Sequence, residues 1–309
     1  MSRSGAYILH IGDQAGVACI LAKYQRSQGY KSQVIKLSTN DKFGIYSFYR
    51  DYISLIASEE QFVNDCLQEG VSADIIHIHS NIDMLFRLRK KFGRTKKLIL
   101  HYHGTDIRGL KKQKLPHRSR LSDLAISLIF TYRRIRNNLL YKKRRMDRKA
   151  QMLADVVIVS TPDLLQNTIK GSIYLPNPVD TDHFNPDKTS TNTKKQALII
   201  DTEVTDTQWV LDYCKKNNIG LDIEVYDRIN NPIMYKDIPS LLKAYNVYID
   251  IRYVDKKILS NLSKTALEAL ACGLDVLDYR LNYCRGLASE HYPINVISQL
   301  SSLYFNDAL

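Results

Sequence analysis

Blocks of apolar residues alternate with amphipathic segments along most of the chain. Short apolar runs typical of buried parallel strands lie at 6–12, 31–37, 73–80, 96–104, 154–161 and 171–178. Residues 15–29 instead place apolar side chains three or four apart and end at Gly29, which indicates a helix with a C-terminal glycine. Buried strands separated by helices predict a parallel α/β sheet.

A second region of the same kind follows a stretch rich in Pro, Asn, Asp, Thr and Lys over 176–196. Strand-like and helix-like segments alternate again from Ala197 to Tyr279. We therefore predict an α/β fold of two Rossmann-like, doubly wound domains that face each other across a cleft, the first over 1–180 and the second over 181–309. We expect the last helix to pack back on the first domain. Ligands of such sheets bind beyond the carboxyl ends of the strands.

The composition indicates the class of protein and its cellular compartment. The 309 residues are 44% hydrophobic and 25% charged, which is typical of a globular protein. The chain has no apolar run of about 18 residues that would form a membrane-spanning helix, and its first apolar stretch is too short for a signal peptide. Five scattered cysteines lack metal-ligand spacing and indicate reduced thiols. We therefore expect a cytoplasmic protein.

The positive charge is concentrated in one segment. Residues 111–149 hold 14 lysines and arginines and two acids, and this excess equals the net charge of +12 of the whole chain. Apolar residues spaced three or four apart within 121–150 predict a basic amphipathic helix, inserted in the first domain near 111–150. Three interpretations stay open: a helix lying on the anionic inner face of the cytoplasmic membrane, a nucleic-acid surface, or a solvated face over an apolar stripe packed on the sheet. The absence of interleaved aromatic residues makes nucleic acid the weaker of the two binding interpretations.

Two strand-to-helix turns carry candidate chemistry. In "HIGDQAG", Gly12 and Gly16 either let backbone N–H groups approach a phosphate at the helix start or simply form a tight turn. In "HYHGTDIRG", a polar set of His103, Asp106 and Arg108 follows a strand directly. The G-x-G-x-x-G fingerprint of dinucleotide binding is absent.

Four histidines form two His-x-His pairs, His77 with His79 and His101 with His103. Both members of a pair share one face of a strand, because side chains alternate. We interpret His77 and His79 as core residues and His101 as structural, and we assign His103, at the strand tip, to the site. Neither pair has a third ligand at convincing spacing, so we predict no metal site.

The stretch "LSKTALEALACG" over 262–273 opens a helix with unusual charges. Ser263 can cap the helix, and Lys264 adds a positive charge to the free N–H groups of the first turn, an arrangement that favours an anion. Glu268 lies one turn further on the same face. The pair is either a surface ion pair of about 0.2–0.5 kcal/mol without function, or a buried carboxylate that needs hydroxyl or cationic partners, such as the hydroxyls of a ribose.

The segment "SKTALEALACGLDVLDY" resembles the donor-binding segment of family 4 glycosyltransferases, which have the GT-B fold. "ADIIHIHS", "HYHGTDIRG" and "ADVVIVSTPDLL" follow the order of that family, and "YLPNPVDTDHFNP" is the most specific match. The resemblance implies a retaining, metal-independent glycosyltransferase without a cofactor, which moves a sugar from a nucleotide-diphosphate sugar to a glycan, lipid-linked or small-molecule acceptor. It also implies a membrane-peripheral enzyme if the basic segment binds lipid.

By the same resemblance, Glu268 holds the ribose, Lys264 and Thr265 meet the diphosphate, Gly16 faces it from the first domain, and His103 contacts the donor sugar. The predicted catalytic residues are His103 and Asp106. The predicted donor-binding residues are Gly16, Arg228, Ser263, Lys264, Thr265 and Glu268. The predicted acceptor or membrane surface consists of Arg108, Arg133, Arg134, Arg136, Lys142, Lys143, Arg144 and Arg145.

Two departures from the family pattern keep alternatives open. Ser260 stands where the family carries the first glutamate of its Glu-x7-Glu motif, and "IIDTEVTDTQWV" lacks the Arg and Lys that clamp the diphosphate. Arg228 is the proposed substitute, and the second domain is divergent and short for the family. The alternatives are a non-catalytic relative that binds a nucleotide or a sugar, and a nucleic-acid-binding protein that uses the basic segment.

Overall fold

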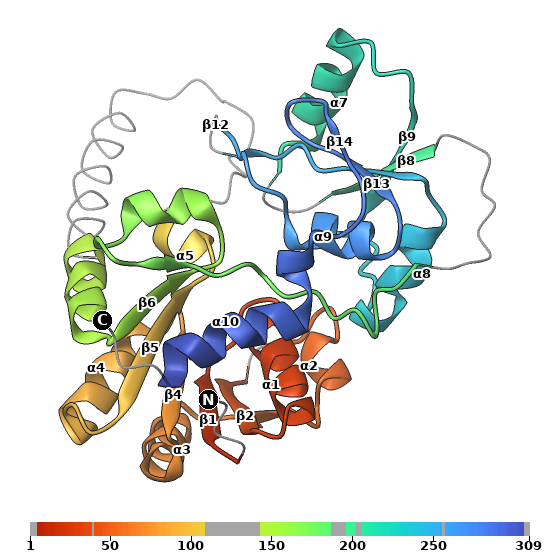
Figure 1. The fold of residues 1–309 in the computed structure, drawn as a ribbon. Coiled ribbons are helices and arrows are strands. Elements are labelled where there is room, and N and C mark those ends of the chain that lie inside the picture. The colour runs from red at the N-terminus through yellow and green to blue at the C-terminus, as the bar shows by residue number, and fades with distance from the viewer. Residues whose placement is uncertain are drawn as a thin grey trace, which may run out of the picture.

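The computed structural model describes residues 5–38, 40–108, 143–186, 196–201, 205–254 and 257–305. The first sheet is parallel throughout, with the strand order β3-β2-β1-β4-β5-β6-β7 (Figure 1). Its strands are β1 (Tyr7–Ile11), β2 (Lys31–Leu37), β3 (Ile53–Ile56), β4 (Ile75–His79), β5 (Lys97–Tyr102), β6 (Val156–Val159) and β7 (Ile173–Tyr174).

Helices cover both faces of this sheet, as the buried strands require. The helices of the first domain are α1 (Val17–Ser27), α2 (Ile45–Phe48), α3 (Glu59–Ser72), α4 (Ile82–Phe92), α5 (Thr105–Arg108) and a 3₁₀ helix (Pro162–Asn167). Leu9 and Ile76 face α3 and α4, whereas Ile8 and Ile75 face α1. This alternation follows from the two-residue repeat of a strand.

The second sheet has the order β14-β13-β10-β8-β9, and only the β13–β14 pair is antiparallel. Its strands are β8 (Gln196–Asp201), β9 (Asp222–Asp227), β10 (Val247–Ile249), β13 (Asp275–Leu277) and β14 (Tyr283–Cys284). Two further strands, β11 (Tyr253–Val254) and β12 (Lys257–Ile258), form a separate hairpin. The helices are α7 (Thr207–Lys216), α8 (Ile238–Lys243) and α9 (Lys264–Ala271), with 3₁₀ turns at Tyr235–Asp237 and Ser289–His291.

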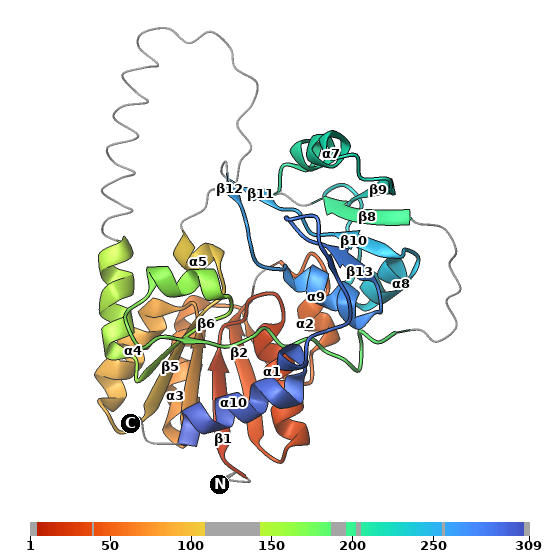
Figure 2. The same cartoon turned by 45° about the horizontal axis from the view of Figure 1, so that its top comes forward.

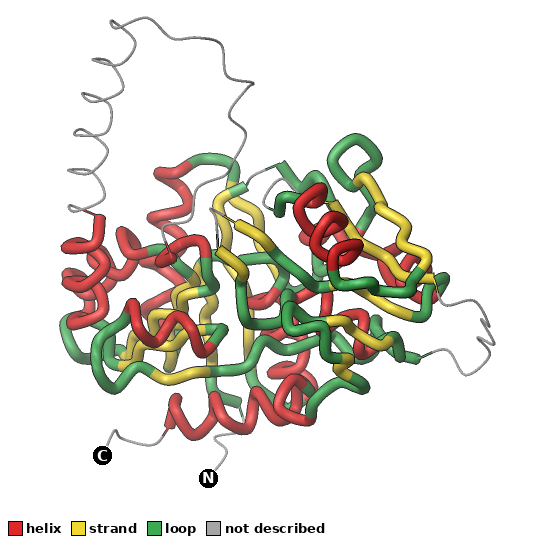
Figure 3. Tube along the Cα trace, turned by 90° about the horizontal axis from the view of Figure 1, so that it is seen from above, coloured by secondary structure: helices red, strands yellow, loops and turns green. Residues whose placement is uncertain are grey.

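The two domains share one apolar cluster. Cys19 and Ile20 of α1 belong to the same buried cluster as Ala266 and Leu270 of α9. The small side chains on both helices allow this close approach. Figure 3, seen from above, shows the helices and strands of the two domains side by side.

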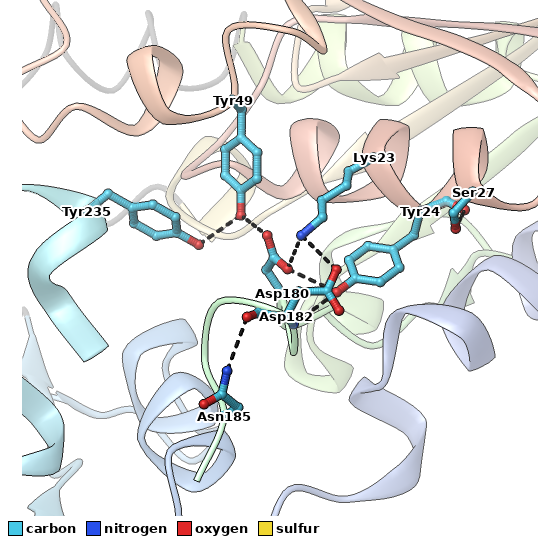
Figure 4. A network of polar contacts seen from close by, with 8 residues as sticks. All are labelled: Lys23, Tyr24, Ser27, Tyr49, Asp180, Asp182, Asn185 and Tyr235. Carbon is cyan, nitrogen blue, oxygen red and sulfur yellow. Dashed lines mark hydrogen bonds and ion pairs between the residues drawn. The ribbon is translucent and has the colours of Figure 1, made fainter. Parts of the chain in front are cut away.

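The chain returns to the first domain at its end. Helix α10 (Pro293–Phe305) packs beside α1, and its Val296, Ile297 and Leu300 are buried against Ile8 of the first sheet. Figure 2 shows α10 lying across this sheet next to α1. The crossing from β7 to the second domain is fixed by Asp180, which lies within a network of polar contacts (Figure 4).

The predicted basic helix falls mostly outside the described residues. Of the segment near 111–150, the structure describes only 143–150, which are helical as part of a helix over 143–153. Arg133, Arg134, Arg136 and Lys142 lie outside the described residues. Among the described residues, none of the helices combines the length and apolarity that crossing a bilayer requires.

Candidate functional site

A cavity of about 240 Å³ lies between the two domains. Its lining includes residues that follow β5 and β6 of the first sheet and β10 of the second, so it lies at the carboxyl ends of both sheets. The charged and polar residues that it brings together from the two domains include His103, Asp106, Arg108, Arg252, Ser263 and Lys264. Five of these six are predicted site residues, although they are up to 161 positions apart in the sequence.

The N-terminus of α9 opens at this cavity. The Ser263 Oγ accepts a hydrogen bond from the Ala266 N–H at 3.0 Å, so the predicted cap is present. Among the residues that the structure describes, no acceptor bonds the N–H groups of Lys264 or Thr265. Two free N–H groups at the positive end of a helix dipole suit an anionic ligand.

Lys264 and Glu268 form a pair that is almost shielded from solvent. Their Nζ and Oε1 atoms are 3.5 Å apart, and the Glu268 residue is only 3% exposed. Burial raises the pKa of Glu268, while the charges of Lys264 and Arg228 act in the opposite direction. Lys264 also donates to the Ala15 carbonyl oxygen of the first domain. The pair is therefore part of the domain interface, and the alternative of an idle surface pair does not hold.

Arg228 lies beside Glu268 but does not line the cavity. Its guanidinium carbon is 3.9 Å from the centre of the Phe43 ring, and its buried Nε has no hydrogen-bond partner among the described residues. Burial lowers its pKa, and the nearby Glu268 charge opposes that shift. Arg228 thus neutralises Glu268 and is not placed to clamp a ligand within this cavity.

Arg252 is a cavity residue that the sequence analysis missed. It follows β10 in "VYIDIRY" and donates to the Asn261 carbonyl oxygen. The available signal was an arginine directly after a buried strand, where ligand sites of such sheets form. Together with Arg108 and Lys264, it gives the cavity three cationic side chains.

Gly16 has a different role from the predicted one. Its N–H donates to the Asp13 Oδ2 at 2.6 Å, and the Asp13 Oδ1 accepts from the Ala18 N–H at 2.7 Å. The buried Asp13 therefore already supplies the anion at the start of α1, and the Gly16 N–H is not free for a diphosphate. Gly16 has φ +82°, and a Cβ there would lie 3.1 Å from Ile45 Cγ2 and 3.4 Å from Lys264 Nζ. The glycine lets the second domain come close.

Asp106 and Arg108 are held firmly by the first domain. The Asp106 carboxylate accepts from the Ser80 hydroxyl and from the N–H groups of His103, Gly104 and Ile107. A role as general base would require it to give up these donors, so its contacts describe a carboxylate that shapes the turn.

Arg108 makes a bidentate pair with the Asp163 carboxylate, at 2.7 and 2.9 Å. The same guanidinium is 3.5 Å from the Asn261 Oδ1 of the second domain. Arg108 therefore spans the two domains at the mouth of the cavity.

The two His-x-His pairs meet His10 in the core of the first sheet. His10, His77, His79 and His101 are buried and His103 is partly exposed. In each of two overlapping sets, His10-His77-His79 and His79-His101-His103, ring nitrogens lie within 4.8 Å of one another. The sequence analysis placed His77, His79 and His101 in the structural core but missed His10 and the convergence, because the register between strands is not visible in one sequence.

Apart from Arg108, the predicted surface residues that fall within the described ranges are exposed. Lys143, Arg144 and Arg145 lie on the helix over 143–153, and the first two line a second cavity of about 580 Å³ next to α5. This basic face lies beside Arg108.

Comparison with known proteins bears on the fold. No family model matches the chain, and no curated protein matches it. Anabaena Alr3699/HepE, solved in complex with UDP and glucose, aligns over 98% of this chain and 90% of its own with a TM-score of 0.51 and 13% identity. An α-glucosyltransferase, solved in complex with UDP and a 13-mer DNA, aligns over 98% and 91% with a TM-score of 0.53 and 10% identity.

These likenesses confirm the predicted fold class. The chain has the GT-B architecture, in which two Rossmann-like domains face each other across a cleft. The narrower resemblance to family 4, with a divergent and shortened second domain, stays a prediction.

Proposed function

We propose that the chain is a glycosyltransferase that uses a nucleotide-diphosphate sugar, retains the configuration of the transferred sugar and needs no metal. One observation carries the proposal: the free N-terminus of α9 and the cations Lys264, Arg108 and Arg252 converge on one interdomain cavity beside His103. The GT-B fold and the UDP complexes of both structural neighbours support it.

The chemistry explains why cations are needed. Transfer breaks the bond between the anomeric carbon and a diphosphate oxygen, and negative charge builds on the departing diphosphate. Fixed donors aimed at such charge are worth about 2.7–4 kcal/mol each. Arg252 and Arg108 would take the place of the Arg and Lys that the second domain lacks. Glu268 does not line the cavity, so it would accept hydrogen bonds from the ribose only after Lys264 has moved onto the diphosphate.

The domains must separate to admit this substrate. A volume of about 240 Å³ is below the roughly 300–1,000 Å³ of typical small-molecule sites. The contact of Lys264 with the Ala15 carbonyl oxygen closes the cavity from one side. We therefore propose that the donor replaces this contact and draws the lysine onto its diphosphate.

The test is thermal unfolding with a panel of nucleoside diphosphates, starting with UDP. A ligand at 100-fold its Kd adds about 2.7 kcal/mol to the free energy of unfolding. We expect that shift with at least one nucleotide in the wild type and in the control Glu60→Ala, whose exposed side chain lies on α3. Lys264→Ala and Glu268→Ala should abolish it. A panel without any shift would contradict the proposal.

A second candidate function is a non-catalytic protein that binds a nucleotide or a sugar. The occupied Gly16 N–H and the presence of Ser260 favour it. Consumption of a UDP-sugar separates the two: saturable binding with no loss of sugar donor above background would leave only the binding function.

We also propose that the basic face places the enzyme on an anionic membrane surface, next to a lipid-linked acceptor. Lys143, Arg144 and Arg145 are exposed, and each cation near such a surface contributes about 1 kcal/mol. Sedimentation with phosphatidylserine vesicles should show binding that weakens with salt. A 13-mer duplex DNA is the matched competitor, because one structural neighbour is in complex with DNA.

A further inference from the structure

A closed ring of hydrogen bonds runs through the core of the first domain. Its eight members are Gln25, His10, His79, His103, Ser160, His101, His77 and Tyr304. They come from β1, β4, β5, the ends of β5 and β6, and helices α1 and α10. All except His103 are buried.

The ring forms because neighbouring strands turn polar residues to the same face. Ile8, Ile75, Ile99 and Ile158 form an apolar cluster with α10. Two residues further along each of these strands stand His10, His77, His101 and Ser160, and the two-residue repeat points them to the same face. In the register of the sheet, His10 lies beside His77 and His79 lies beside His101, so the polar side chains form a continuous set across the strands.

One half of the ring leads from Gln25 to His103. The Gln25 Oε1 is 2.8 Å from the His10 Nε2, and the His10 Nδ1 is 3.0 Å from the His79 Nε2. The His79 Nδ1 is 2.9 Å from the His103 Nε2, and the His103 Nδ1 is 2.8 Å from the Ser160 Oγ. Each imidazole thus uses both of its nitrogens.

The other half leads back through α10. The Ser160 Oγ is 2.9 Å from the His101 Nε2, and the His101 Nδ1 is 3.1 Å from the His77 Nε2. The His77 Nδ1 is 2.6 Å from the Tyr304 Oη, to which the Gln25 Nε2 donates at 3.4 Å. The ring closes on the same amide from which it began.

This amide fixes where every proton lies. The Gln25 Oε1 can only accept, so the His10 Nε2 carries its proton. A neutral imidazole has one N–H, so the His10 Nδ1 must accept from the His79 Nε2, and the same step repeats at His103. The His103 Nδ1 therefore accepts from the Ser160 hydroxyl. In the other direction, Tyr304 donates to His77, His77 to His101, and His101 to Ser160.

We propose that Gln25 sets the direction of this ring and thereby holds His103 as the neutral tautomer with its proton on Nε2. His103 then presents the cavity with an accepting Nδ1, which a sugar hydroxyl reaches by replacing the Ser160 hydroxyl. The last step rests on the proposed function, whereas the tautomer does not. The other seven members are positioning residues for His103, and His103 binds a hydroxyl instead of acting as a general acid.

The pKa shifts of the five ring histidines agree with neutral imidazoles. Burial lowers the pKa of His10 to about 4 and holds the pKa of the other four histidines below the usual value. Asp106 and Asp13 act against this shift at His103, and Lys264 acts with it.

The same geometry argues against a metal ion among these histidines. A metal requires three unprotonated nitrogens that point to one place. Each ring histidine has a single unprotonated nitrogen, and that nitrogen already accepts a hydrogen bond within the ring. Binding an ion would break hydrogen bonds of the ring, at a cost of about 1–3 kcal/mol for each group left unsatisfied in the core.

The test is a long-range ¹H–¹⁵N spectrum of protein labelled in its histidine rings. We expect all five ring histidines to show the proton on Nε2. His291 and His183 are internal controls: the His291 Nδ1 donates to the Asn177 carbonyl oxygen and must carry a proton, unlike the Nδ1 of the ring histidines, while the His183 Nε2 donates to the Tyr235 carbonyl oxygen. A ring histidine with its proton on Nδ1, an imidazolium at neutral pH, or a stoichiometric metal in the purified protein would overturn the proposal.

A variant tests the role of Gln25 itself. In Gln25→Glu the ionised side chain only accepts, so Tyr304 donates to it and His77 and His101 carry their protons on Nδ1. The single Ser160 proton then serves either His101 or His103, so the ring opens at Ser160. The matched control Ser32→Ala removes a buried donor to the same Oε1, at 2.7 Å, and leaves the ring direction unchanged. Unchanged tautomers in a folded Gln25→Glu protein would refute the role of Gln25. Should that variant not fold, the wild-type spectrum still decides the proposal.

Both experiments measure histidine tautomers in protein to which no sugar donor has been added. Failure of the proposed glycosyltransferase would therefore leave them unchanged, and failure of the ring would not alter nucleotide binding by Lys264. The two proposals are distinguishable.

Discussion

At the scale of single residues, Asp180 is the polar group on which the domain crossing depends. Its carboxylate is fully buried and accepts from the Lys23 Nζ at 2.6 Å, the Tyr24 Oη at 2.9 Å and the Tyr49 Oη at 2.8 Å (Figure 4). The Tyr49 Oη is in turn 3.2 Å from the Tyr235 Oη of the second domain. One carboxylate therefore ties α1, the segment after α2 and the crossing chain together.

We expect Asp180→Ala to lower the free energy of unfolding by about 1–3 kcal/mol for each polar group that it leaves unsatisfied, since it removes the acceptor of the Tyr24 and Tyr49 hydroxyls and leaves Lys23 only the exposed Asp182 carboxylate. Asp182→Ala is the matched control, because this carboxylate binds the same Nζ at 2.9 Å but its side chain is 65% exposed. That control should cost less than about 1 kcal/mol. Urea unfolding of both variants measures the difference, and equal losses would contradict the assignment.

At the scale of elements, the N-terminus of α9 can be compared with the N-terminus of α3, a helix outside the site. Ser263 caps α9 beside the cavity, and Ser58 caps α3 far from it through the Gln61 N–H at 3.1 Å. Both serines cap a helix, but only Ser263 lies beside the cavity. Comparing them separates the stability of a helix from its part in ligand binding.

Ser263→Ala and Ser58→Ala should each lower the free energy of unfolding by about 1 kcal/mol, the usual cost of losing a helix cap. Only Ser263→Ala should also weaken nucleotide binding, because the first turn of α9 holds the free N–H groups. Calorimetric titration with the nucleotide found by thermal unfolding measures this effect. Equal binding by the two variants would remove α9 from the site.

At the scale of the whole molecule, five neutral histidines in one core link stability to pH. Their pKa values are lower in the folded state than in the unfolded chain, so unfolding takes up protons in mildly acidic solution. The contribution of these neutral histidines to the free energy of unfolding is fully present above about pH 6.5 and is lost as the pH falls from 6.5 toward 4. Burial raises the pKa of Glu268, so this group acts in the opposite direction to the histidines and reduces the net proton uptake.

We therefore expect a net uptake of several protons on unfolding near pH 5, at about 1.4 kcal/mol per pH unit for each proton. Urea unfolding at several pH values between 4.5 and 7.5 gives the slope. His10→Gln should reduce the uptake by about one proton. An uptake of one proton or fewer in the wild type would show that the histidines are not buried as neutral groups.

Local sequence patterns predicted many of the strands and helices and their order, although not β3 or the β11–β12 hairpin. The apolar runs predicted at 6–12, 73–80 and 96–104 are strands, because a two-residue repeat or a continuous buried run is a local property. The start of α9 at Lys264 was also predictable, since the capping serine and the first-turn charge are neighbours in sequence. The fold class followed from the alternation of these elements.

The contacts of these residues, in contrast, follow from the tertiary structure. Asp13 takes the Gly16 N–H, Arg252 enters the cavity, and Glu268 is buried at the domain interface, all through contacts that no local pattern encodes. The histidines show the reason most directly. Whether His10 lies beside His77, and His79 beside His101, depends on the order β1-β4-β5 and on the register between strands, which are fixed by packing between segments far apart in the chain.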